Sequence, residues 1–266
     1  MKGEAKAEII GAARMLMDEH RRQVKFRSFA AEFGIVDIEA AYAVQREFVR
    51  LQMQSRESGA IGYKVGLTSP RMQQMCGIDS PIAGVVLADR VHQTGIRLDP
   101  SGYGRLGLEF EIAVRMSRDL GRGGGPVTLS DVAESVDAVC PAMEIVDDRD
   151  ADYGSLDVLC LVADNSWNGG IVLGAFQRSW PDLATIEGIV RADGQVVDQG
   201  SGRDVLGHPF HSVAWLAEHL AKDGEGLRAG DIVMTGNLVT TKFPAAPSSY
   251  RFDAVGLGSV ELSIGA

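Results

Sequence analysis

Two glutamates, Glu109 and Glu111, stand in a segment whose intervening positions are apolar. Every even-numbered residue of Leu106–Met116 is Leu, Phe, Ile, Val or Met, and this period of two is typical of a β-strand with one buried face. Because successive strand side chains point to opposite faces, both carboxylates project from the same face, about 6 to 7 Å apart at the backbone. Like charges at this spacing repel, so a cation must offset them if that face is covered.

A third glutamate, Glu144, lies in segment 140–147, CPAMEIVD. If this segment is also a strand, Glu144 shares a face with Ala142 and Val146, where an isolated charge is costly to bury. Three carboxylates that leave three coordination positions open suit an octahedral Mg²⁺ or Mn²⁺, with water and substrate completing the shell. The pair at 109 and 111 also fits a solvated strand face, and sequence spacing alone does not bring Glu144 to it.

Two further segments contain candidate functional residues. Lys64 lies between two glycines in a short strand-like segment, so its ammonium faces either a pocket or, as most lysines do, water. The polar cluster at 164–170, DNSWNGG, follows the apolar residues 158–163, which we expect to form a strand. Loops after strands often carry function, although such a cluster can equally be only a turn. His208 and His211 have a spacing that zinc could use, but no cysteine or acidic ligand stands beside them.

The net charge limits the classes of binding partner, and the cysteine content indicates the cellular compartment. The formal net charge of -10, from 36 acidic and 26 basic residues, argues against nucleic acid as a partner. The three cysteines, Cys76, Cys140 and Cys160, are odd in number and far apart, which argues against a disulfide framework and favours a reducing compartment. No secretory signal and no apolar run of about 18 residues occurs. We therefore expect a cytoplasmic protein that does not enter a membrane.

Helical patterns flank the strand-like segments. Apolar spacing predicts helices over about 4–22 and 37–57, with Asp37 as the N-cap of the second. A capping box at Thr128 and Asp131 predicts a short helix to about residue 139, and 210–222 forms another. Between them, short runs rich in Val, Ile and Leu alternate with turn residues. The pattern indicates an N-terminal helical section, residues 1–60, that leads into a mostly β body, residues 61–266, in one cooperative unit.

Ordered motifs along almost the whole chain resemble one group of enzymes. They are GYKVGLTSP at 62–70, GIDSP at 77–81, LEFEIAV at 108–114, PAMEIVDDR at 141–149 with VADN at 162–165, and LGHPFHSVAWLA at 206–217 followed by GDIVMTG at 230–236. Together they resemble the 2-keto-4-pentenoate hydratase and 4-oxalocrotonate decarboxylase group of the fumarylacetoacetate hydrolase superfamily. The resemblance implies an α+β fold, a mixed β-roll with an N-terminal helical section and flanking helices, assembled into homo-oligomers.

The resemblance also implies a site. The metal ligands of the group fall on Glu109, Glu111 and Glu144, and its active-site lysine falls on Lys64. Lys64 is expected to pair with the substrate carboxylate or to act as an acid or base.

Four other residues are expected at the pocket. Asp79, a weaker acid or base candidate, and Asp164 lie in segments that border the pocket of the group. Ser166 and Trp167 stand where members of the group often have Ala and Ser, so Trp167 replaces a small polar side chain. Together they would give the substrate tail an apolar wall with one indole donor. Such a wall suits a short uncharged tail, whereas a cation from Lys242 at the pocket mouth would favour a second carboxylate.

The expected substrates are small 2-oxo or 2-hydroxydienoic acids of aromatic catabolism. A 2-oxo acid would bind the metal through its carboxylate and keto oxygens and leave one position for water. Stabilising the resulting enolate serves ketonisation, hydration and decarboxylation alike. We expect metal-dependent hydration of a 2-hydroxy-2,4-dienoate to a 4-hydroxy-2-oxo acid. The alternatives are decarboxylation of a 2-oxo-3-enedioate and a catalytically silent structural partner.

Overall fold

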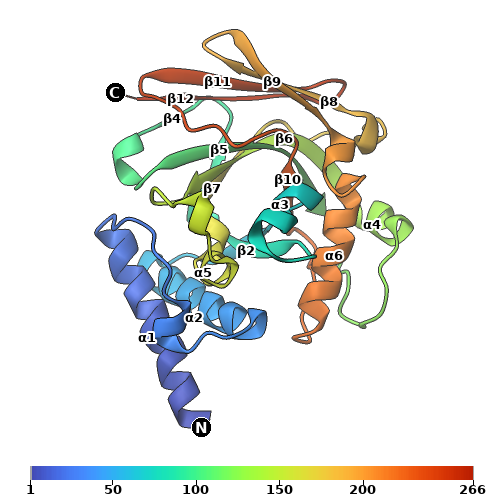
Figure 1. Cartoon of the computed structure of the whole chain (residues 1–266). Helices are drawn as coiled ribbons and strands as arrows, with labels where there is room; N and C mark the ends of the chain where they lie inside the picture. The colour runs from blue at the N-terminus through green and yellow to red at the C-terminus, as the bar shows by residue number, and fades with distance from the viewer. Residues whose placement is uncertain (1, 266) are drawn as a thin grey trace.

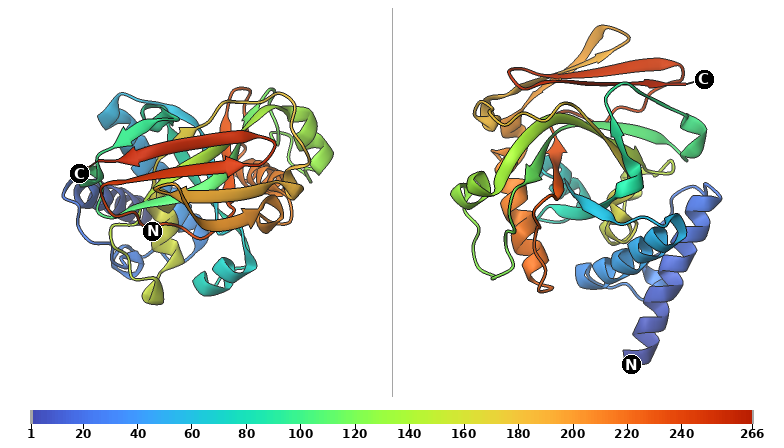
Figure 2. Two further views of the ribbon diagram at one scale, coloured as in Figure 1. Left: turned by 90° about the horizontal axis from the view of Figure 1, so that it is seen from above. Right: turned by 180° about the vertical axis from the view of Figure 1, so that it is seen from behind.

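Two β-sheets form the body of the protein in a computed structural model that describes residues 2–265. They stack face to face, with β8, β9, β11 and β12 at the top of Figure 1 and of the right-hand view of Figure 2. The first sheet has the order β2 (Ile82–Leu87), β1 (Ala60–Gly66), β10 (Ile232–Asn237), β5 (Leu106–Met116), β6 (Val136–Asp147), β7 (Asn168–Leu173) and β3 (Val91–Gln93). The second has the order β4 (Ile96–Leu98), β12 (Gly258–Ile264), β11 (Ser248–Ala254), β8 (Glu187–Ala192) and β9 (Gln195–Ser201).

Helices cover the outer side of the first sheet and its edges. They are α1 (Lys2–Arg21), α2 (Ile38–Arg56), α3 (Pro70–Cys76), α4 (Leu129–Ser135), α5 (Val158–Ala163) and α6 (Pro209–Ala221). The helices α1 and α2 pack against each other, and α2 contacts α5 (Figure 1). The α+β class and the two N-terminal helices are confirmed, and Asp37 caps α2 by accepting a hydrogen bond from the Ala40 amide.

Two expectations about local structure were inaccurate. Residues 158–163 form helix α5, not a strand, and Asp157 caps this helix by accepting a bond from the Leu159 amide. The capping box at Thr128 and Asp131 is present, but its helix ends at Ser135 because β6 begins at the next residue. A run of six apolar residues has no periodicity that separates a buried helix from a buried strand, which explains the first error.

Strand β5 has the alternation that its sequence predicts. Phe110 points between the sheets, with its ring centroid 5.8 Å from that of Phe252 and 6.1 Å from that of Tyr250. The two glutamates beside it point to the opposite face. The largest cluster of buried apolar side chains extends from Ala12 in α1 to Ile264 in β12, so the N-terminal helices and the sheets share a core.

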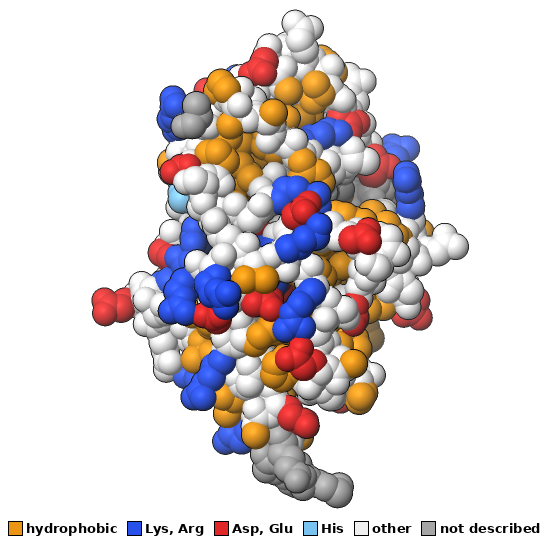
Figure 3. All heavy atoms as spheres, turned by 60° about the vertical axis from the view of Figure 1, so that its left-hand side comes forward, with side chains coloured by type: hydrophobic (Ala, Val, Ile, Leu, Met, Phe, Trp, Pro, Cys, Tyr) orange, Lys and Arg blue, Asp and Glu red, His pale blue; other side chains and the backbone are white. Residues whose placement is uncertain are grey.

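The surface carries charges of both signs. On the face drawn in Figure 3, Lys and Arg side chains lie next to Asp and Glu, with hydrophobic side chains between them. Among residues 2–265, none of the helices is both long enough and apolar enough to cross a membrane.

Candidate active site

The structure brings Glu109, Glu111 and Glu144 together. The antiparallel pairing of β5 and β6 places Glu109 directly opposite Glu144, and Glu111 follows on the same face of β5. One carboxylate oxygen from each of the three residues lies within 4.8 Å of the other two. Glu111 and Glu144 are fully buried, whereas Glu109 is partly exposed. This is the arrangement that the sequence alone left open.

The carboxylates are only partly satisfied by hydrogen bonds. Each accepts one bond: from the Gly236 amide to Glu111 Oε2 at 2.7 Å, from Asn168 Nδ2 to Glu144 Oε1 at 2.8 Å, and from Thr241 Oγ1 to Glu109 Oε1 at 2.7 Å. Glu111 Oε1 and Glu144 Oε2 are buried and have no hydrogen-bond partner within the described part of the chain. A buried oxygen without a partner is costly, and a cation bound between these atoms would remove that cost. The donor set therefore fits a divalent metal that prefers oxygen ligands.

Lys64 faces the glutamates from β1. Its Nζ lies 3.3 Å from Glu144 Oε1, and the residue is only 5% exposed. A glycine on the adjacent strand makes room for it, because a Cβ on Gly84 would lie 3.3 Å from both Cγ and Cε of Lys64. Of the two positions that the sequence allowed for Lys64, the structure shows the pocket and not the surface, as the family resemblance implied.

Burial and like charge shift the pKa values of these groups. Burial raises the pKa of Glu111 well above its usual 4.5, and the carboxylates of Glu144 and Glu109 raise it further. Burial raises the pKa of Glu144 to about 7, although Lys64 opposes the shift. Burial lowers the pKa of Lys64, but the three glutamates outweigh it and the net shift is upward. Lys64 stays protonated, and a divalent cation would bring three carboxylates and one ammonium to neutrality.

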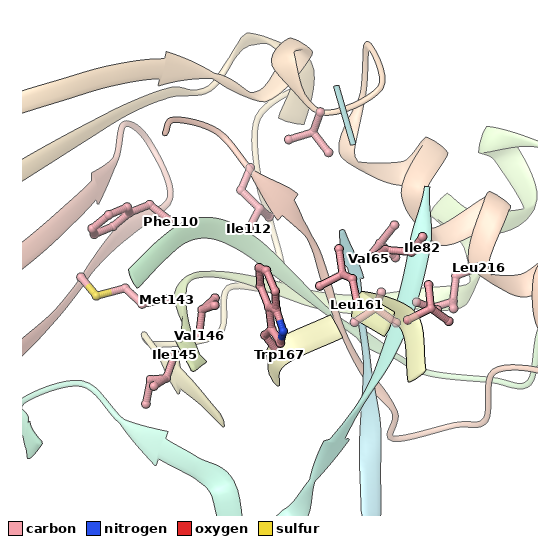
Figure 4. Close-up of a cluster of buried hydrophobic side chains, with 14 of the residues drawn as sticks. Val65, Ile82, Phe110, Ile112, Met143, Ile145, Val146, Leu161, Trp167 and Leu216 are labelled. Carbon is pink, nitrogen blue, oxygen red and sulfur yellow. The ribbon is translucent and has the colours of Figure 1, made fainter. Parts of the chain in front are cut away.

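A cavity of about 410 Å³ opens at Lys64 and Glu109. Its wall is largely apolar, with Ile82, Val146, Leu161, Trp167, Val239 and Phe243 among the lining side chains. Figure 4 shows Ile82, Val146, Leu161 and Trp167 within a buried hydrophobic cluster. Ser166 also lines the cavity, beside Trp167. Besides Lys64 and Glu109, Ser166 and Trp167 are the expected pocket residues that the structure brings to the cavity.

Asp164 and Asp79 lie elsewhere. Asp164 is 1% exposed and does not line the cavity; it contacts His20 and Arg149 instead. Asp79 is exposed and lines a separate surface hollow together with Gln74 and Ser80. We therefore give neither residue direct contact with a substrate.

The remaining cationic and imidazole candidates have structural partners. Lys242 pairs with Asp198, so its ammonium is held outside the cavity. His208 caps α6 by accepting a bond from the Phe210 amide. In the described residues, the group of side chains placed to share a metal is the three glutamates.

Several residues of the site were not predicted individually. Asn168 lay in the polar cluster that was expected to be a loop, and Thr241 lies after β10, where no pattern was recognised. Gly236 contributes through its backbone amide, which no side-chain pattern reveals. Arg71, on α3, also lines the cavity.

Comparison with known proteins identifies the family. The family model described as fumarylacetoacetate (FAA) hydrolase C-terminal matches residues 81–264. The chain is 31% identical to a 2-oxo-hept-4-ene-1,7-dioate hydratase of Escherichia coli, over 93% of this chain and 94% of that protein. It is 33% identical to a 2-keto-4-pentenoate hydratase of Burkholderia vietnamiensis, over 84% of this chain and 85% of that protein.

Among solved structures, 4-oxalocrotonate decarboxylase from Pseudomonas putida G7, complexed with magnesium and adipate, superposes with a TM-score of 0.88 at 28% identity. The match covers 97% of this chain and 98% of that chain. The fold is therefore of the fumarylacetoacetate hydrolase type, as the sequence motifs indicated. This protein belongs to the fumarylacetoacetate hydrolase family.

Proposed function

We propose that this protein is a metal-dependent hydratase that converts a 2-hydroxy-2,4-dienoate to a 4-hydroxy-2-oxo acid in aromatic catabolism. The observation that carries the proposal is the convergence of three glutamates and Lys64 at a cavity with a largely apolar wall. The similarity to the two hydratases supports the reaction, since each is named for a 2-oxo-4-enoate, which is the keto tautomer of a 2-hydroxy-2,4-dienoate.

Glu109, Glu111 and Glu144 would hold the metal, Mg²⁺ or Mn²⁺. Their two buried oxygens without partners support this assignment, as does the magnesium in the related decarboxylase. When bound, a divalent metal supplies Lewis-acid stabilisation of the negative charge that develops on the substrate keto oxygen.

The chain itself must move protons and position the substrate. Hydration of a 2-hydroxy-2,4-dienoate adds hydrogen at C5 and C3 and hydroxyl at C4, while the 2-hydroxyl proton is lost. We assign Lys64 either to pairing with the substrate carboxylate or to one of these proton transfers, because its Nζ is at the cavity and protonated. Ser166 and Trp167 would contact the tail of the substrate, which the largely apolar wall would bury.

A second candidate is decarboxylation of a 2-oxo-3-enedioate, which the similarity to 4-oxalocrotonate decarboxylase favours and which the position of Arg71 allows. Arg71 lines the cavity, is exposed, and forms no ion pair within residues 2–265. A guanidinium there could pair with a second substrate carboxylate. Retention of all three glutamates and Lys64 argues against the silent-partner alternative, because the uncompensated cluster would only destabilise the fold.

Product analysis separates the two reactions. The Mg²⁺-loaded protein is incubated with 2-hydroxypenta-2,4-dienoate or with 2-oxo-3-hexenedioate, and products are followed by proton NMR and by release of carbon dioxide. We expect 4-hydroxy-2-oxopentanoate from the first. Rapid carbon dioxide release from the second, with no hydration of the first, would reverse the assignment.

We further propose that the sheets form a mixed β-roll and that the protein works in the cytoplasm as a homo-oligomer. The three buried free cysteines support a reducing compartment, and the family resemblance supports assembly. The shared core supports unfolding of residues 1–60 and 61–266 as one unit.

A further inference from the structure

The N-terminal helical section lies outside the region that the family model matches, yet it contacts the wall of the cavity. The matched region begins at residue 81. Glu19 and His20, at the end of α1, and Phe26, in the loop after it, contact residues between 149 and 167. These contacts do not belong to the metal site, and the proposed chemistry gives them no role.

Asp164 is the centre of these contacts. His20 Nε2 lies 2.5 Å from Asp164 Oδ1, and Arg149 donates from Nη2 to Asp164 Oδ2 at 2.7 Å. The other end of the Arg149 guanidinium donates from Nη1 to Glu19 Oε2 at 3.0 Å. The Asp164 and Arg149 side chains are fully buried. We call His20, Glu19, Arg149 and Asp164 the Asp164 clamp.

The clamp holds the start of an unusual backbone segment. The backbone φ values of Asn165, Ser166 and Trp167 are 50°, 50° and 60°. Residues other than glycine rarely adopt such positive values. Such a segment persists only where its surroundings fix it. Strand β2 holds the same segment from another side. The Asn165 side chain accepts a bond from the Val85 N–H and donates to the Val85 C=O, and Ser166 Oγ donates to the Ala83 carbonyl at 3.1 Å.

The same section supports the Trp167 ring directly. The Phe26 ring meets that of Trp167 edge to face, with centroids 5.1 Å apart. The Arg149 guanidinium lies 5.6 Å from the centroid of the Phe26 ring. The clamp and Phe26 therefore form a continuous support behind the cavity wall that Ser166 and Trp167 provide.

We propose that the Asp164 clamp is a positioning device through which the N-terminal section controls recognition of the substrate tail. Asp164 does not touch the substrate; it holds the segment that places Trp167 and Ser166 against the tail. The metal-binding glutamates lie on β5 and β6 and are positioned by strand pairing. Loss of the clamp should therefore weaken contacts with the tail and spare the binding of the 2-oxo-carboxylate end. This inference rests on the proposed function.

The test compares two ligands that differ only in the tail. Pyruvate has the 2-oxo-carboxylate and no tail, whereas 2-oxohexanoate adds an apolar tail. Their dissociation constants are measured by calorimetry on the full-length, Mg²⁺-loaded protein. Wild type should bind 2-oxohexanoate more tightly than pyruvate, because the tail is buried against the apolar wall.

His20→Leu should weaken 2-oxohexanoate binding about fivefold or more and change pyruvate binding less than twofold. Asp164→Asn keeps the side-chain volume, should act in the same direction, and serves if the first variant does not fold. His20→Gln retains a donor and should restore much of the tail preference. The matched control is Lys25→Ala, which breaks an exposed ion pair with Asp150 between the same two parts of the chain and should change neither constant.

An unchanged preference for the tail in folded His20→Leu and Asp164→Asn would overturn the inference and leave the proposed function intact. Equal weakening of both ligands would also overturn it, because the clamp would then support the whole fold and not the tail wall. If wild type binds neither ligand, the proposed function fails, and the inference fails with it.

Discussion

Replacing Glu111 with Gln should make the metal-free protein more stable while it removes most of the activity. The wild-type carboxylate is buried beside two others, and one of its oxygens has no hydrogen-bond partner among the described residues. An amide at this position removes the charge, keeps an oxygen for the Gly236 amide, and gains an NH₂ that can donate to a neighbouring carboxylate.

The expected size of the effect follows from the cost of a buried polar atom without a partner. Burial and the carboxylates of Glu144 and Glu109 raise the pKa of Glu111 well above 4.5, so the ionised form is disfavoured in the metal-free fold. Leaving a buried acceptor such as Glu111 Oε1 without a partner costs about 1 to 3 kcal/mol. Relief of this penalty should therefore stabilise metal-free Glu111→Gln by roughly 1 to 3 kcal/mol, or about 2 to 6 °C in Tm for a chain of this size.

Bound metal should reverse this order of stability and make wild type more stable than Glu111→Gln. Wild type gains about 2.7 kcal/mol when free Mg²⁺ is at 100 times its Kd, whereas the variant has lost a charged ligand and should gain far less. Its rate should fall about 10²-fold or more, the scale for removing an electrostatic stabiliser.

The assay is thermal unfolding at pH 8 in chelator and in Mg²⁺, with hydration rates measured on the same samples. The matched control is Glu187→Gln, an exposed residue on β8, which should change neither quantity. If Glu111→Gln is less stable than wild type in chelator and gains as much from Mg²⁺, the three carboxylates do not form a strained metal site.

Three further predictions concern Lys64, Glu144 and Arg71. Lys64→Met should lower turnover about 10²- to 10⁴-fold in steady-state kinetics, and unchanged turnover would make the buried ammonium purely structural. The folded pKa of Glu144 is about 7, above its usual 4.5, so the protonated carboxyl stabilises the metal-free fold at low pH. This contribution to the free energy of unfolding is lost as pH rises from 4.5 to 7. Mg²⁺ must displace the protons that Glu144 and Glu111 retain, so its affinity by calorimetry should rise as pH rises from 4.5 through 7; a flat profile would contradict these shifts. Arg71→Gln should lower kcat/KM for a diacid and spare the monoacid, and equal use of both substrates by wild type and variant would remove Arg71 from tail recognition.

Local patterns predicted much of this architecture because they depend only on nearby residues. The period of two in β5 predicted the shared face of Glu109 and Glu111, and Asp37 marked the start of α2. The family motifs placed Lys64 and Glu144, but no spacing shows that β5 and β6 pair in the register that sets Glu109 opposite Glu144. Strand register depends on contacts between distant segments, which one sequence does not reveal.

Long-range contacts also explain what was missed. Asp164 was expected at the pocket from the family resemblance, but it is 144 residues from its partner His20, and no local signal joins them. In contrast, Asp157 just before the apolar run 158–163 was a visible N-cap signal that argued for helix α5. Arg71 directly follows the motif at 62–70, but its direction depends on how α3 packs, so no local pattern predicts that it lines the cavity.

The most direct test is the hydration of 2-hydroxypenta-2,4-dienoate by one preparation before chelation, after chelation and after Mg²⁺ is restored. The arrangement of Glu109, Glu111, Glu144 and Lys64 predicts formation of 4-hydroxy-2-oxopentanoate that disappears with the metal and returns with it. Full activity in the chelated protein, with no metal detected by elemental analysis, would contradict the account.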